Sequence, residues 1–114
     1  MQISLHIETH DRRLGFEMAA TGNTLRSGTA VSVPGGATLE YTGTFVCKSV
    51  GIPEVLQFII DASISIDLGL FSAWLYDKVK EKPVERIIVN RRVITTITKE
   101  TIRQVLEEEI RSRE

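Results

Sequence analysis

The chain has 114 residues, of which 42% are hydrophobic and 25% are charged. This composition is typical of a globular protein and excludes a disordered, collagen-like or coiled-coil chain. The length predicts a single domain over residues 1–114, with a core large enough to fold without a metal or disulfides. Fourteen basic and fifteen acidic side chains give a net charge of −1, so the chain as a whole does not attract nucleic acid or an anionic membrane.

The single cysteine, Cys47, cannot form an internal disulfide, and the N-terminal sequence lacks the basic and apolar regions of a secretory signal. Together these features predict a reducing, cytoplasmic compartment. A nucleophilic Cys47 would need His6 or His10 as its base. A buried position as a small hydrophobe is the simpler interpretation of this cysteine.

Residues 1–52 carry the alternating apolar pattern of half-buried strands. The pattern appears at Ile3, Leu5 and Ile7, at Leu14, Phe16 and Met18, at Val31 and Val33, and at Leu39, Tyr41 and Phe45. Pro34-Gly35-Gly36 has turn composition. Because strands joined by short links are most easily antiparallel, we predict a strand meander over residues 1–52.

One long apolar helix is predicted over residues 53–80. Between residues 55 and 76 the only charged side chains are Asp61 and Asp67, and a helix that is apolar around most of its circumference must be covered on most sides. We expect Asp61 to lie on a narrow polar stripe and Asp67 to cap or kink the helix. Alternating isoleucines near residues 63–65 leave open a kink or two separate helices.

The last third of the chain predicts a hairpin over residues 84–97, turning at Asn90-Arg91, and a closing helix over residues 99–112 with Thr98 as its N-cap. One face of that helix is apolar, formed by Ile102, Val105, Leu106 and Ile110. The predicted fold class is therefore α+β: an antiparallel sheet of about five or six strands with one long apolar helix and one C-terminal amphipathic helix.

The first strand carries a candidate metal site. His6, Glu8 and His10 share one face of this strand, and imidazole and carboxylate groups are ligands for zinc and other divalent ions. Same-face neighbours on a strand lie about 7 Å apart, so adjacent members could share an ion, whereas His6 and His10 are too far apart. A polar, solvent-facing strand surface is the alternative interpretation.

No established catalytic motif is present in the sequence: Walker, Gly-x-Ser-x-Gly, His-Glu-x-x-His and Cys-x-x-Cys spacings are all missing. The six-residue spacing of Asp61 and Asp67 does not form an acid–base pair on a helix. The basic pairs Arg12-Arg13 and Arg91-Arg92 stand beside acidic residues and lack interleaved aromatics. We expect no enzymatic activity, no cofactor and no nucleic-acid partner.

The long helix carries more apolar surface than one sheet face can cover, which indicates an interface with a protein partner or with a second copy of the chain. We expect Phe71, Trp74 and Tyr76 to form this surface, because aromatic residues are enriched among interface hot spots. The same segment, residues 55–76, is long enough to span a bilayer, although two aspartates would oppose insertion.

Three short segments stand out in the second half of the chain: Phe71 to Lys78 (FSAWLYDK), Ile87 to Asn90 (IIVN) and Thr98 to Ile102 (TKETI). With these segments the chain resembles small bacterial effector-associated domains encoded beside conflict-system effectors. Within residues 62–110 the resemblance implies an apolar helix ending in a Trp-Leu motif, a charged break, a strand pair and a closing helix. It also implies a non-enzymatic adaptor in bacterial immunity, and it supplies no site residues.

The leading hypothesis is a non-enzymatic protein-interaction module, namely a small bacterial or phage adaptor, inhibitor or immunity-type protein that acts through a partner or by self-association. One alternative is a small metal-binding protein or metal-dependent enzyme that uses His6, Glu8 and His10. Another is a membrane-associated component held by the helix over residues 55–76.

Overall fold

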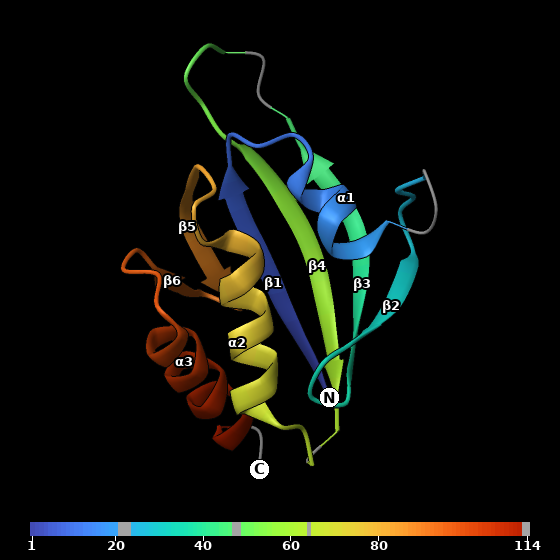
Figure 1. The fold of residues 1–114 in the computed structure, drawn as a ribbon, viewed down its shortest axis with the longest axis vertical. Helices are drawn as coiled ribbons and strands as arrows, with labels where there is room; N and C mark the ends of the chain where they lie inside the picture. The colour runs from blue at the N-terminus through green and yellow to red at the C-terminus, as the bar shows by residue number, and fades with distance from the viewer. Residues whose placement is uncertain (21–23, 47–48, 64, 113–114) are drawn as a thin grey trace.

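The computed structural model describes residues 1–20, 24–46, 49–63 and 65–112. These residues form one six-stranded antiparallel sheet and three helices (Figure 1), which confirms the predicted α+β class. In chain order the elements are β1 (Gln2–Thr9), α1 (Leu14–Ala19), β2 (Thr29–Val33), β3 (Ala37–Phe45), β4 (Glu54–Ala62), α2 (Leu68–Val79), β5 (Val84–Val89), β6 (Arg92–Ile94) and α3 (Lys99–Arg111).

The first strand lies inside the sheet. The strand order is β2-β3-β4-β1-β5-β6, so β1 pairs with β4 on one side and with β5 on the other. His6, for example, lies opposite Gln57 of β4 and Ile88 of β5. The predicted meander over residues 1–52 is therefore wrong for β1, because the central position gives this strand two pairing partners from later in the chain. The strands β2, β3 and β4 do form a meander.

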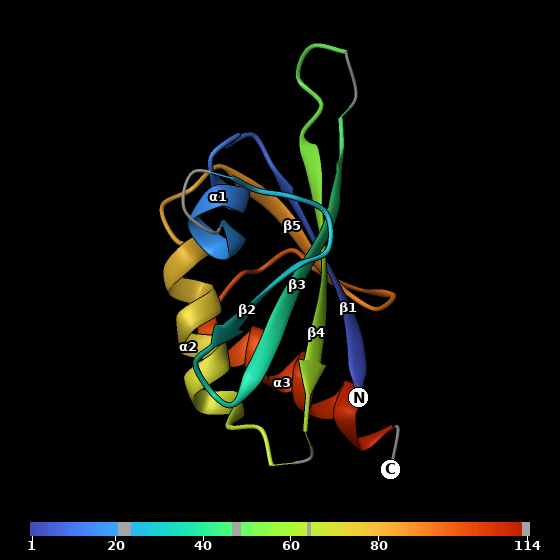
Figure 2. The ribbon, with the colours of Figure 1, turned by 90° about the vertical axis from the view of Figure 1, so that its right-hand side faces the viewer.

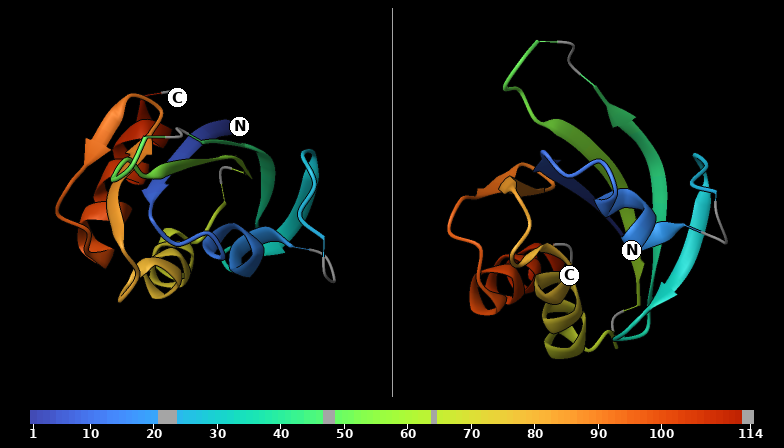
Figure 3. Two further views of the ribbon diagram at one scale, coloured as in Figure 1. Left: turned by 90° about the horizontal axis from the view of Figure 1, so that it is seen from above. Right: turned by 45° about the horizontal axis from the view of Figure 1, so that its top comes forward.

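Helices α1 and α2 lie on the same face of the sheet (Figure 2). The core is formed by one side of each strand, and β1 contributes Ile3, Leu5 and Ile7, all fully buried. On the opposite face of β1, Ser4 and His6 are half-buried. Helix α3 packs beside α2, as the view from above shows (Figure 3).

The predicted long helix over residues 53–80 is wrong. Its first part is β4, a strand flanked on both sides by other strands, and only its second part, α2, is helical. Alternate residues of β4 enter the core, from Leu56 to Ala62. Val55 and Ile59 on the opposite face are half-buried, and this is why the strand has a nearly continuous apolar run that resembles a buried helix.

The predicted strand at Leu14, Phe16 and Met18 is also wrong, since these residues belong to the short helix α1. Leu14 and Met18, four residues apart, are buried, whereas Phe16 between them is exposed, as helical periodicity requires. The turn into α1 is held by Asp11, whose carboxylate accepts a hydrogen bond from the Arg13 amide at 2.9 Å.

The remaining elements confirm their predictions. The β5–β6 hairpin turns at Asn90-Arg91, and Asn90 has a positive φ of 55°, which asparagine tolerates better than most residues. Helix α3 begins after Thr98, whose hydroxyl accepts a hydrogen bond from the Thr101 amide at 3.1 Å. Asp67 caps α2 in the same way, accepting from the Leu70 amide at 3.1 Å.

The β2–β3 turn contacts the start of α2. Gly35 has a φ of +101°, and a Cβ atom at this position would lie 2.7 Å from the Asp67 carbonyl oxygen. The Asp67 amide donates a hydrogen bond to the Gly35 carbonyl oxygen at 2.9 Å. Glycine is therefore required at this position both for its backbone conformation and for the close approach of α2.

Candidate interaction surface

The described residues of the link between β3 and β4 project beyond the body of the molecule (Figure 1). We call these residues, Val46, Ser49, Val50, Gly51 and Ile52, together with Phe45 at the end of β3, the arm. Of the eight large hydrophobic residues that are exposed in the described part of the chain, four lie in the arm. Phe45 is 63% exposed, Val46 56% and Ile52 49%, and Val50 is fully exposed. The arm is therefore the main concentration of unburied apolar side chains among the described residues.

Hydrogen bonds at the base of the arm keep β3 and β4 together. The Thr42 hydroxyl donates to the Gln57 carbonyl oxygen at 3.0 Å, at a position where the pairing register of β3 shifts. The Tyr41 hydroxyl is hydrogen-bonded to that of Thr44, and the Tyr41 ring packs edge-on against Phe58 with ring centroids 5.8 Å apart. The strand pairing then continues to the start of the arm. These contacts fix the direction in which the arm leaves the sheet.

Beneath the arm lies a hollow of about 430 Å³. Arm residues line one side, and Thr9, His10, Arg12 and Glu54 line the other. The Arg12 guanidinium lies 3.7 Å from the Glu54 carboxylate. The described outer residues Val46, Val50 and Ile52, which we call the tip of the arm, are therefore exposed and apolar, and the base of the arm is bordered by charged groups.

Helix α2 carries the three aromatic residues predicted to contact a partner, and the structure separates them. Phe71 is fully buried in the core, so its side chain is not available at the surface. Trp74 and Tyr76 are half-buried, and the Trp74 ring lies 5.9 Å from that of Phe71. Leu70, 56% exposed, is the large apolar residue that α2 presents most openly to solvent.

A second hollow, of about 470 Å³, lies beside Trp74 and Tyr76. Pro34, Leu70 and Ala73 add apolar lining, and charged groups come from Asp77, Lys80 and Lys99. Lys80 contacts Asp77 at 2.9 Å. The hydrogen bond and the positive charge of Lys80 lower the pKa of Asp77 from its ordinary value, and the same hydrogen bond and the negative charge of Asp77 raise the pKa of Lys80. A contact surface at this hollow would therefore combine half-buried aromatic rings with an ion pair.

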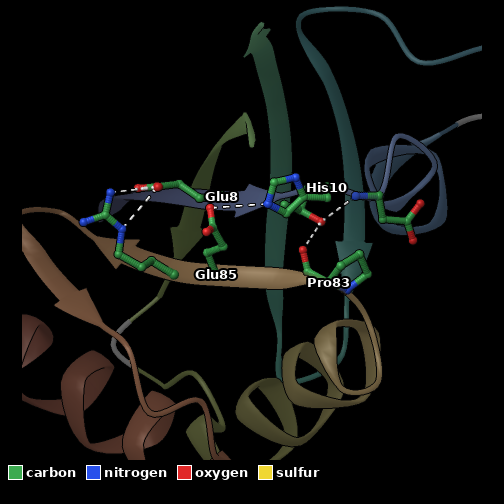
Figure 4. A network of polar contacts seen from close by, with 7 residues as sticks. Glu8, His10, Pro83 and Glu85 are labelled. Carbon is green, nitrogen blue, oxygen red and sulfur yellow. Dashed lines mark hydrogen bonds and ion pairs between the residues drawn. The ribbon is translucent and has the colours of Figure 1, made fainter. Parts of the chain in front are cut away.

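The predicted metal ligands on β1 have other partners (Figure 4). Arg86 of β5 donates to one Glu8 oxygen from two nitrogens, at 3.1 and 2.8 Å, and this contact raises the arginine pKa. His10 lies beyond the end of β1, where its ring nitrogen is 3.5 Å from Glu85 and its amide donates to the Pro83 carbonyl oxygen at 2.9 Å. His6 contacts the Ser4 hydroxyl at 3.3 Å. The contacts of Glu8 and His10 join β1 to β5, which is a structural role.

Within the described part of the chain, no group of three or more histidine, cysteine, aspartate or glutamate residues could hold a metal ion. Asp61 is exposed on β4, and its carboxylate lies 3.6 Å from the N-terminal amine. Cys47 lies outside the described residues, so its predicted burial stays a prediction.

The described residues of 55–76 do not form the single helix that the membrane-associated alternative requires. No helix in the described ranges is long and apolar enough to cross a membrane. The two basic pairs are partly neutralised, since Arg12 approaches Glu54 and Arg92 forms an ion pair with Glu108.

The exposed apolar side chains of the arm were not predicted from the sequence. Val50 and Ile52 alternate with Ser49, Gly51 and Pro53, which are typical turn and link residues. Apolar side chains in a link of this kind are a signal of exposed apolar surface. The apolar run of β4, which follows directly, hides this signal because it also fits a buried helix.

Comparison with known proteins gives no further information on function: no protein-family model, no curated protein and no solved structure matches this chain at a significant level.

Proposed function

We propose that this chain is a non-enzymatic protein-interaction module that places the apolar tip of its arm in a cleft of a protein partner. The observation that carries the proposal is the set of four exposed apolar side chains on a projecting, well-anchored hairpin. Exposed apolar clusters cost solubility in a free protein and commonly mark interaction sites. The core has no need of these side chains, since they lie outside it.

The surroundings of the arm suit a protein partner. Arg12, Glu54 and His10 place polar and charged groups around the base of the apolar tip, and an apolar centre with a polar rim is the usual composition of a protein interface. The strand pairing behind the tip limits the conformational entropy that binding would cost.

A second contact region is the surface of α2 around Trp74 and Tyr76. Its hollow and the exposed side chain of Leu70 favour a contact, but the Trp74 and Tyr76 rings are already packed partly against the core. In this proposal the α2 surface adds to binding, and the arm supplies the larger part of it.

The resemblance of residues 62–110 to effector-associated domains supports an adaptor, inhibitor or immunity-type role. The elements α2, β5, β6 and α3 follow one another in the order that this resemblance implies. The β1–β5 contacts of Glu8 and His10 make a metal-dependent role the weaker alternative.

The test compares two exposed valines. Val50 is in the arm, and Val93, 52% exposed on β6, is its matched control. Tagged wild-type, Val50→Asp and Val93→Asp chains are used to capture partners from the source cells, and the mass of each purified chain in solution is measured by light scattering. We expect a stoichiometric partner, or a dimer of the chain itself, that is lost in Val50→Asp and kept in Val93→Asp. Equal capture and equal mass for all three chains would overturn the proposal.

A further inference from the structure

A third hollow, of about 200 Å³, lies between α2 and the first turn of α3, and we call it the α2–α3 hollow. Helix α2 lines it with the small residues Gly69, Ser72 and Ala73, and α3 lines it with Lys99, Glu100 and Arg103. This hollow lies on α2 and α3, whereas the arm extends from β3 and β4 at the other end of the molecule (Figure 1). The α2–α3 hollow shares Ala73 and Lys99 with the hollow beside Trp74 but no residue with the arm. An inference about it therefore does not rest on binding by the arm.

Ser72 presents an unusual polar group in this hollow. The residue is 2% exposed, and its hydroxyl oxygen has no hydrogen-bond partner among the described residues. A buried hydroxyl without a partner costs about 1–3 kcal/mol, so such groups in folded proteins usually have a role or an additional ligand.

The charges at the start of α3 are also unpaired. Further along this helix the charged side chains have partners: Arg111 contacts Glu107 at 2.8 Å, and Glu109 accepts a hydrogen bond from Asn90 at 2.9 Å. Within the part of the chain that the structure describes, Lys99 and Arg103 form no such contact, although both line the hollow. Two cationic residues therefore line the same hollow as Ser72.

The backbone of α3 adds hydrogen-bond donors. The Thr98 hydroxyl accepts a hydrogen bond from the Thr101 amide, and the Thr98 carbonyl oxygen accepts one from the Ile102 amide. The amides of Lys99 and Glu100 precede the first intrahelical hydrogen bond and have no acceptor within the helix. Amides at a helix N-terminus together with the helix dipole favour a bound anion.

We propose that the α2–α3 hollow binds an oxyanion of the phosphate class, either free or carried by a larger molecule. Arg103 and Lys99 neutralise its charge, the first-turn amides of α3 donate to its oxygens, and the Ser72 hydroxyl donates one further hydrogen bond. Glu100 is the one carboxylate among the residues lining the hollow, and it reduces the affinity. The site therefore binds weakly unless Glu100 turns toward solvent.

The test uses the isotope-labelled full chain and inorganic phosphate, with sodium chloride at matched ionic strength as the control. We expect saturable amide shifts at residues 99–103 and 72–73 with phosphate and not with chloride. Arg103→Gln should weaken binding by about tenfold, as expected for the loss of a charge-assisted hydrogen bond. Arg26→Gln, which removes an exposed arginine from the link before β2, is the matched control and should leave the affinity unchanged.

Two further variants separate binding from packing. Glu100→Gln should tighten phosphate binding, because it removes the opposing charge. Ser72→Ala should weaken it several-fold, roughly the value of one hydrogen bond. A Ser72→Ala chain that is more stable but binds phosphate as well as the wild type would show that Ser72 only packs, and would overturn its assignment.

A capped phosphoserine peptide, titrated in parallel, identifies the source of the oxyanion. Tighter binding of the peptide than of inorganic phosphate would indicate a phosphorylated partner, and tighter binding of inorganic phosphate a free ion. The proposal is overturned if the shifts with phosphate match those with chloride, or if Arg103→Gln and Arg26→Gln bind phosphate equally well.

Discussion

The arm and helix α2 both present apolar side chains on the outside of the molecule, but the two regions hold them differently. In α2, Phe71 is fully buried and Trp74 is half-buried against it, so the exposed ring surface continues from the core. In the arm, Val50 is fully exposed and belongs to no core cluster. The comparison shows that the same residue types can stabilise the fold in one place and be free for a partner in the other. Mutations should therefore change stability in α2 and binding in the arm.

The largest effect on stability is expected at Phe71. Phe71→Ala removes a fully buried ring and should lower the free energy of unfolding by about 3–5 kcal/mol. Urea denaturation followed by circular dichroism measures this value. A loss below 1 kcal/mol, together with lost partner binding, would instead place Phe71 at an interface.

Trp74→Ala should cost about 2 kcal/mol, less than a core aromatic, because the ring is only half-buried. The same variant should weaken partner binding less than Val50→Asp does. If Trp74→Ala abolishes binding in a chain that remains folded, the relative importance of the two surfaces must be reversed.

Asp67, the N-cap of α2, can be compared with Asp61 of β4, which caps no helix. Asp67→Ala removes the acceptor for the Leu70 amide and should cost about 1 kcal/mol. Asp61→Ala, at an exposed strand position, should change the free energy of unfolding by less than about 0.5 kcal/mol. Thermal unfolding of both variants checks the difference, and equal values would argue against capping by Asp67.

Acid should affect the helical side of the molecule through Glu108. The hydrogen bond from Arg92 lowers the pKa of Glu108 below its ordinary value of 4.5. A carboxyl group with a lowered pKa in the folded state stabilises the fold above its unfolded pKa, and this contribution is lost as the pH falls through the folded pKa. Because the pair is exposed, the effect should be small. Glu108→Gln should accordingly flatten the acid side of the stability profile measured by urea denaturation, whereas an unchanged profile would contradict a role for this pair.

The smallest effect on stability is expected in the arm. Val50→Ser should change the free energy of unfolding by less than about 0.5 kcal/mol, because the side chain contacts solvent. A loss comparable to that of Trp74→Ala would mean that Val50 is buried in solution, for example against a second copy of the chain. Dilution would then lower the thermal midpoint of the wild type.

Local patterns predicted the elements whose periodicity is unambiguous. The alternation at Ile3, Leu5 and Ile7 and the helical spacing in α3 both correspond to one buried face. Thr98 was predicted as an N-cap because a short polar side chain precedes the helical spacing. For Asp67 the sequence left a cap or a kink open, and the structure shows an N-cap. For these elements the local sequence and the tertiary structure favour the same conformation.

The remaining elements depend on tertiary neighbours that no local pattern reveals. The central position of β4 half-buries Ile59 on the face opposite the core, so the strand loses its polar alternation and resembles a buried helix. In α1, Leu14, Phe16 and Met18 fit a strand or a helix equally well, and only the burial of Leu14 and Met18 distinguishes the two. The arm likewise depends on tertiary structure, because its position is set by where β4 begins.

The central place of β1 has a consequence for synthesis on the ribosome. This strand is synthesised before its two neighbours, β4 and β5, which follow much later in the chain, and contacts between distant segments are slow to form. Until β5 has left the exit tunnel, one edge of β1 lacks its pairing strand. An apolar strand with an unpaired edge is prone to aggregation. Release of the last third of the chain, rather than of its first strands, should therefore determine when the sheet closes.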